Sequence, residues 1–66
     1  QDSIVSYKSA LEIQPDNANC HFNLGTAYFD LFNKESSIQH YKECIKYDTS
    51  NIDAYLLLAK VLDKND

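Results

Sequence analysis

The sequence predicts an all-α fold in which about four helices pack as antiparallel helical hairpins. Apolar residues recur at helical spacing in four segments, and polar stop and cap residues separate these segments. The second half of the chain also repeats the first half, which indicates a structural repeat. The connecting loops are short, and helices joined by short loops pack as antiparallel neighbours.

The internal repeat appears when the sequence is aligned with itself after a shift of 34 residues. The shift pairs identical residues at Ser3/Ser37, Ile4/Ile38, Tyr7/Tyr41, Lys8/Lys42, Asn17/Asn51 and Leu24/Leu58. At many other pairs an apolar residue meets an apolar residue, and the small residues Gly25 and Ala59 align. These two small residues are expected where helices cross closely, because a larger side chain would push the backbones apart.

The first helix is predicted over residues 2–13, where Ile4 and Leu11 belong to an apolar stripe. It should end before Pro15, because the residue that precedes a proline disfavours helical geometry. Asn17 then supplies a side-chain oxygen that can cap the next helix.

Three further helices are predicted over residues 18–31, 35–47 and 52–64, each with apolar residues at helical spacing. Asn51 stands before the last of them and repeats the capping role of Asn17.

One motif resembles a known family. The residues that carry it are His21-x2-Leu24-Gly25-x2-Tyr28, followed by Ser37-x3-Tyr41. They resemble the signature of the tetratricopeptide repeat (TPR), whose paired helices stack into an α-solenoid. The resemblance covers the whole chain. It implies the second helix of one repeat at 1–17, a complete repeat at 18–51 and the first helix of the next at 52–66.

Three positions depart from the family's pattern and indicate a divergent repeat. His21 replaces a large aromatic residue, the loop at 31–33 lacks the usual glycine, and Thr49 replaces a proline. In that loop Asn33 is expected to take the left-handed conformation, which asparagine adopts more readily than most residues. Phe32 is then expected to turn back into the hairpin.

Composition excludes several function classes. Ten acidic residues against six lysines give a net charge of −4, which is unsuited to a nucleic-acid backbone. The longest apolar run, Ala54 to Ala59, is far shorter than a membrane-spanning helix, so no membrane insertion is expected. The chain begins at Gln1 without a targeting signal and resembles a piece of something longer. An intracellular, cytoplasmic location is expected.

No catalytic or metal centre is predicted. Cys20, His21, His40 and Cys44 include ligand types that zinc accepts, but adjacent Cys20 and His21 project in different directions on a helix. Packing roles are favoured for them, and reduced thiols are favoured over a Cys20–Cys44 disulfide. No nucleophile lies beside a base and no glycine-rich phosphate loop exists, so neither an enzyme nor a cofactor is expected.

A binding surface remains as the expected functional feature. In the family that the chain resembles, first helices of successive repeats line a concave groove that holds peptides or helices of partner proteins. The positions that match this groove are Asn19, Phe22, Asn23, Thr26, Phe29, Asp30, Asp53, Leu56, Leu57 and Lys60. The apolar ones, Phe22, Phe29, Leu56 and Leu57, could instead pack between neighbouring helices.

The partner expected for this groove is a protein segment that is apolar or mildly basic. Asn23 matches an asparagine that some family members use to hold acidic peptide termini or peptide backbone, but Asp53 and Leu57 break both patterns at the next positions. Asp30 and Asp63 would also repel an acidic tail. The alternative is a self-association module that forms homo-oligomers through uncapped apolar faces of the two end helices.

Overall fold

The computed structural model describes residues 2–63, and the predicted end of the last helix at Lys64 lies outside them. The described residues form four helices: α1 (Asp2–Ile13), α2 (Ala18–Asp30), α3 (Lys34–Tyr47) and α4 (Ile52–Asp63). No strand occurs among residues 2–63. The predicted all-α fold is therefore confirmed, with α2 and α3 each bounded within one residue of the predicted ends.

Asparagine side chains cap the helices as predicted. Asn17 Oδ1 accepts a hydrogen bond from the backbone N–H of Cys20 at 3.2 Å. Asn51 Oδ1 accepts one from the backbone N–H of Ala54 at 3.0 Å. Each bond satisfies a donor that the first turn of a helix leaves without a partner.

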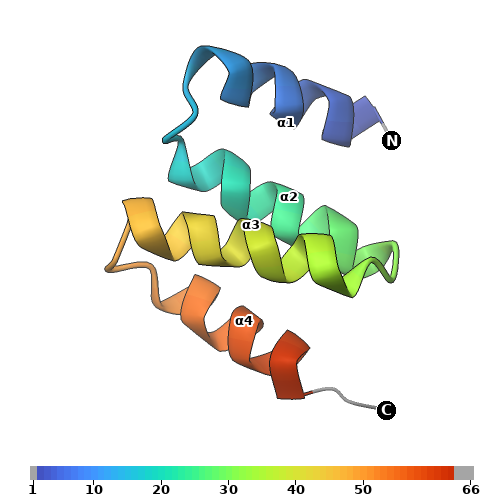
Figure 1. The fold of residues 1–66 in the computed structure, drawn as a ribbon, viewed down its shortest axis with the longest axis vertical. Helices are drawn as coiled ribbons and strands as arrows, with labels where there is room; N and C mark the ends of the chain where they lie inside the picture. The colour runs from blue at the N-terminus through green and yellow to red at the C-terminus, as the bar shows by residue number, and fades with distance from the viewer. Residues whose placement is uncertain (1, 64–66) are drawn as a thin grey trace.

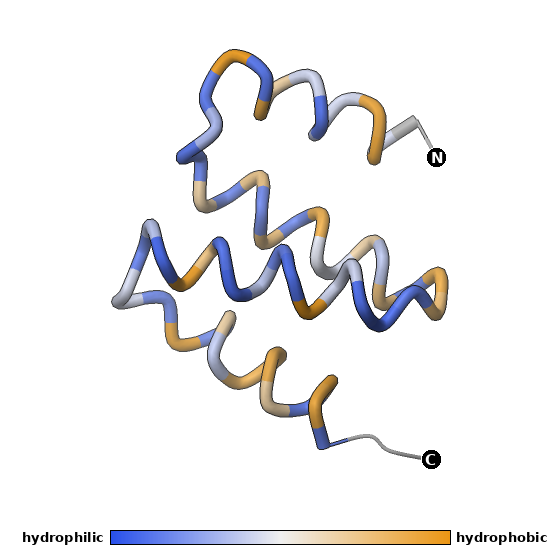
Figure 2. Tube along the Cα trace, viewed as in Figure 1, coloured by the Kyte–Doolittle hydropathy of each residue, from blue (hydrophilic) through white to orange (hydrophobic). Residues whose placement is uncertain are grey.

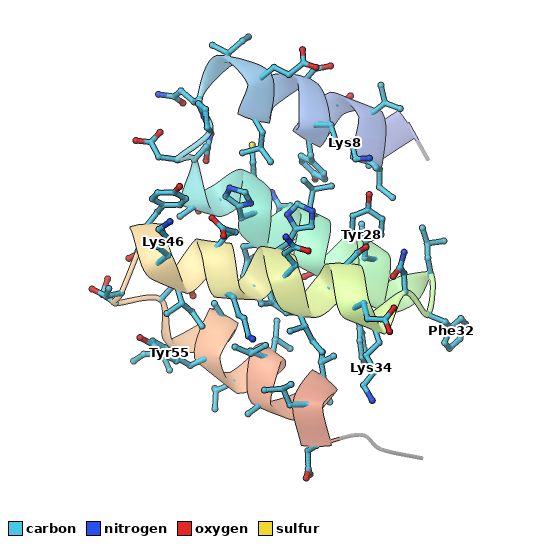
Figure 3. All side chains as sticks on the ribbon, viewed as in Figure 1. Lys8, Tyr28, Phe32, Lys34, Lys46 and Tyr55 are labelled. Carbon is cyan, nitrogen blue, oxygen red and sulfur yellow. The ribbon has the colours of Figure 1, made fainter. Side chains whose placement is uncertain are left out.

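The loop between α2 and α3 turns at a different residue from the one predicted. Phe32, with φ of 61°, takes the left-handed conformation, whereas Asn33 has φ of −98°. Asn33 instead caps α3, because its Oδ1 accepts a hydrogen bond from the N–H of Ser36 at 3.3 Å. Phe32 is 94% exposed and points away from the helices at the tip of the hairpin (Figure 3). The expectation that Phe32 packs into the hairpin was wrong.

The helices form a thin stack with the α2–α3 hairpin in the middle. α1 packs against α2, and α4 packs against α3 (Figure 1). The stack measures 35 × 27 × 14 Å, so each helix keeps a large exposed face. Hydrophobic residues are prominent along α4, which lies at the C-terminal end of the stack (Figure 2).

The core lies around the crossing of α2 and α3. A Cβ atom built on Gly25 would lie 2.7 Å from Cδ1 and Cε1 of Tyr41, so only glycine fits there without a shift of the ring. Ser37 Oγ donates a hydrogen bond of 2.7 Å to the Gly25 carbonyl. The predicted close crossing at Gly25 is confirmed. The buried apolar residues are Cys20, Leu24, Tyr41, Cys44, Ala54 and Val61.

Ala59 does not repeat the role of Gly25 within the described residues. Its side chain is exposed, whereas the neighbouring turns of α4 bury Ala54 and Val61. α4 packs against α3, and the face that contains Ala59 stays open to solvent.

Candidate interaction surface

The candidate groove residues of α2 lie on one face of that helix. Asn19 and Asp30 are exposed near its two ends. The residues between them are half-buried: Phe22, Asn23, Thr26 and Phe29. This face therefore combines accessible aromatic surface with polar groups at its ends.

Tyr41 of α3 supports the middle of this face from behind. Its hydroxyl lies 2.8 Å from Thr26 Oγ1, which itself donates to the Phe22 carbonyl at 3.2 Å. The tyrosine therefore donates its proton to Thr26. The Phe22 ring also meets the Tyr41 ring at 5.8 Å and 56°, a tilted aromatic contact. Burial raises the pKa of the Tyr41 hydroxyl, so it stays protonated near neutral pH.

The candidate groove residues of α4 are more exposed. Leu56 is 62% exposed, Leu57 is half-buried, and Asp53 and Lys60 are exposed. Among the described residues, no hydrogen bond or ring contact joins a candidate residue of α2 to one of α4. The structure therefore gathers the candidates into two separate helix faces, and their use as one groove stays a prediction.

A shallow depression on α3 lies apart from the predicted groove. It has a volume of about 510 Å³ and is lined by Glu35, Ile38, Gln39, Lys42 and Glu43. None of the predicted groove residues lines it. It is open to solvent, which is unlike the enclosed pockets that hold small molecules.

The two histidines form a contact that the sequence did not predict. His21 Nδ1 and His40 Nδ1 lie 3.2 Å apart, and His21 Nε2 lies 3.0 Å from the Pro15 carbonyl. A carbonyl can only accept, so His21 Nε2 carries a hydrogen and donates to it. In its neutral form His21 then accepts at Nδ1 from the Nδ1–H of His40. The ring centres are 5.4 Å apart, so the two Nδ1 atoms lie nearly on the line between them.

Two tyrosines extend this pair into a row of four rings. The His21 ring meets Tyr47 at 5.9 Å and 22°, and the His40 ring meets Tyr28 at 5.6 Å and 8°. Burial, the neighbouring His21 and then Lys8 lower the pKa of His40, while Glu43 opposes this shift. Lys8 lies on the side of α1 that faces α2 (Figure 3). The row therefore links α2 and α3 with the loop that follows α1.

The histidine pair is arranged to share one hydrogen between its two Nδ1 atoms, which lie at hydrogen-bonding distance. Within residues 2–63 no group of three or more His, Cys, Asp or Glu side chains is placed to hold a metal.

The cysteines serve packing roles. Cys20 and Cys44 are both free and buried. Cys44 Sγ lies 3.5 Å from Asn51 Nδ2, which donates to it, and burial raises the pKa of the Cys44 thiol. A raised thiol pKa disfavours the reactive thiolate.

The geometry defines a class of protein built from repeated helical hairpins, in which a small residue of one helix receives an aromatic residue of the next. Comparison with known families gives the particular one. A model described as "TPR repeat" matches residues 1–31, and a model described as "Tetratricopeptide repeat" matches residues 18–51. Because the second match covers more than half of the chain, the chain belongs to the tetratricopeptide repeat family.

One curated relative is "BBSome complex member bbs-4" of Caenorhabditis elegans. It is 29% identical to this chain over 63 residues, which is 96% of this chain and 14% of the relative. The chain thus spans about one seventh of the length of that relative.

Family membership establishes the general role. Repeats of this family mediate protein–protein interaction and form an interaction module, not an enzyme. None of the described helices is long and apolar enough to cross a membrane.

Proposed function

We propose that this chain is a scaffold module that binds a peptide or helix of a partner protein along the candidate faces of α2 and α4. The observation that carries the proposal is the exposed apolar surface on these faces, with Phe22 half-buried on α2 and Leu56 62% exposed on α4. Packing in the core does not explain why a leucine stands at position 56, because most of its side chain is exposed. The relative bbs-4 is by its name a member of a complex, which agrees with a scaffold role.

The proposed partner segment is apolar or mildly basic. Asp30 and Asp53 are both exposed on the candidate faces and would attract lysine side chains and repel acidic ones. Asn23 is half-buried on the candidate face of α2, where its amide can bind peptide backbone. No cofactor is part of this proposal.

A matched pair of leucine variants tests this function. The probe is a labelled peptide of alternating leucine and lysine, followed by fluorescence anisotropy at concentrations where the protein is monomeric. Leu56→Ala should raise the Kd about tenfold, because it removes a central apolar contact. Leu62→Ala, also an exposed leucine of α4 but outside the candidate faces, should leave the Kd within about twofold.

Two results would contradict the proposal. The first is an equal loss of affinity in Leu56→Ala and Leu62→Ala. The second is tight binding of an equally long peptide with an acidic C-terminus, weakened by Asn23→Ala. Such binding needs basic side chains around the peptide, whereas the candidate faces carry exposed aspartates.

Self-association is a second candidate function, favoured by the exposed apolar side chains of the two end helices. Ile13 of α1 is 83% exposed, and Ile52 and Leu62 of α4 are 68% and 51% exposed. Surfaces of this kind are buried when copies associate.

The two free buried cysteines agree with a reducing, cytoplasmic location, which stays part of the proposal.

A further inference from the structure

The histidine pair lies inside the chain, where three segments meet. His21 of α2 binds in two directions: its Nδ1 lies 3.2 Å from His40 Nδ1 on α3, and its Nε2 donates to the Pro15 carbonyl at 3.0 Å. Pro15 belongs to the loop that joins α1 to α2. His40 is half-buried, and its ring stacks on Tyr28. The pair therefore connects the α2–α3 hairpin to the loop that positions α1.

The α2–α3 hairpin is held together by contacts that carry no charge near neutral pH. The Tyr41 ring lies on Gly25, and Ser37 Oγ donates a hydrogen bond of 2.7 Å to the Gly25 carbonyl. Neither contact changes its protonation state in mild acid. A new charge on the histidine pair therefore meets a fixed α2–α3 crossing, and it acts on the packing of α1 instead.

The charges around His40 come from all three helices. Within residues 2–63, the groups that act on it are His21 of α2, Lys8 of α1 and Glu43 of its own helix, and none of them belongs to α4. Burial, then His21 and then Lys8 lower the pKa of His40, and Glu43 opposes them. Lys8 extends from the side of α1 that faces α2 (Figure 3). Among these groups, Lys8 alone lies outside the α2–α3 hairpin.

The first proton taken up in acid binds His40 at Nε2. Both nitrogens of His21 are already engaged, since Nε2 donates to Pro15 and Nδ1 accepts from His40. The bond between the two Nδ1 atoms is kept, and the His40 ring becomes positive. Lys8 then faces a second positive charge, so the repulsion acts between α1 and the hairpin.

We propose that the junction between α1 and the α2–α3 hairpin is a pH-sensitive hinge, in which a proton on His40 repels Lys8 and releases α1 from α2. The loop at 14–17 absorbs the movement. The released form takes up the proton more readily, because Lys8 no longer opposes it. The released fraction therefore grows as the pH falls below 6.5, the ordinary pKa of histidine. Release uncovers the side of α2 on which α1 packs.

An NMR titration of the two histidines tests the electrostatic step. The Cε1–H signal of His40 should titrate below 6.5 in the wild type. Lys8→Gln should raise this pKa, because it removes a positive charge that opposes the proton. Lys42→Gln is the matched control: Lys42 is an exposed lysine of α3 that does not act on His40, so the His40 pKa should stay unchanged.

Amide hydrogen exchange tests the release itself. α1 has 12 residues, and a helix of that length is marginal once it leaves its partner, so its amides exchange on release. The α1 amides should be less protected than those around Gly25 and Tyr41, and they should lose at least about threefold in protection between about pH 7.5 and about pH 5. This loss should be smaller in Lys8→Gln and in His40→Gln, and unchanged in Lys42→Gln. Circular dichroism at neutral pH confirms that each variant folds.

Three results would overturn the proposal. The first is a His40 pKa that is the same in Lys8→Gln and wild type. The second is equal protection of the α1 amides and the core amides at every pH, because α1 would then open only when the whole fold unfolds. The third is an α1 protection loss in acid that is as large in His40→Gln as in the wild type.

Discussion

His21 and His40 face each other through their Nδ1 atoms at 3.2 Å, although they lie on different helices. The Pro15 carbonyl fixes the hydrogen of His21 on Nε2. One hydrogen between the two Nδ1 atoms makes a good bond. Burial of His40 and then the neighbouring His21 disfavour a second, positively charged hydrogen on the His40 ring and lower its pKa.

This relationship predicts that acid destabilises the fold. The pKa of His40 is lowered in the folded state, so the unfolded chain binds the proton more readily. The free energy of unfolding should therefore be greatest above the unfolded pKa of 6.5, decrease as the pH falls below 6.5, and level off below the folded pKa. Urea unfolding followed by circular dichroism at a series of pH values measures this decrease.

A variant of His40 isolates its share of the pH dependence. His40→Gln cannot take up a proton, so its stability should vary less with pH across the same window. Variants of Tyr55, an exposed residue on α4, should keep the wild-type pH dependence. If the free energy of unfolding varied with pH identically in His40→Gln and wild type, His40 would not be the cause of the destabilisation by acid.

Gly25→Ala should lower the free energy of unfolding by about 1–3 kcal/mol, because its Cβ would overlap the Tyr41 ring. Replacement of a glycine by alanine inside a helix normally raises the free energy of unfolding by about 0.5–1 kcal/mol. A decrease for Gly25→Ala therefore shows that the added Cβ atom clashes with its surroundings. In a Tyr41→Leu background the loss should shrink, because the ring is gone. Thermal or urea unfolding of the four chains of this double-mutant cycle measures the coupling. A stabilising Gly25→Ala in the wild-type background would contradict the close crossing.

Phe32→Gly should stabilise the protein by about 1 kcal/mol, because φ of 61° is unfavourable for phenylalanine and free for glycine. Phe32 is 94% exposed, so the change removes little buried apolar surface. Phe32→Ala is the control, since alanine keeps the unfavourable φ and should give almost no gain. Equal stabilities of the two variants in urea unfolding would mean that the turn has no strain.

The sequence predicted the helices well because each boundary depends on nearby residues. The caps at Asn17 and Asn51 act on a backbone N–H three residues along. The α2–α3 loop was wrong because Asn33 suits two roles. An N-cap requires a negative φ, so when Asn33 caps α3 the left-handed residue must be Phe32.

The tertiary contacts of the site were harder to predict. His21 and His40 lie 19 residues apart in sequence, and only the α2–α3 packing brings their rings together. The sequence alignment that paired Gly25 with Ala59 correctly placed the first at a helix crossing. It could not show that the Ala59 face is open, because exposure depends on which helices are present to cover it.

Chemical-shift mapping by NMR locates the partner-binding surface proposed on α2 and α4. The isotope-labelled chain is titrated with the leucine–lysine peptide, and the backbone signals are followed. We expect the largest shifts to cluster at Phe22, Asn23 and Thr26 on α2 and at Asp53, Leu56 and Leu57 on α4. Shifts that cluster instead on the α3 depression around Ile38 and Lys42, or no saturable shifts at all, would contradict it.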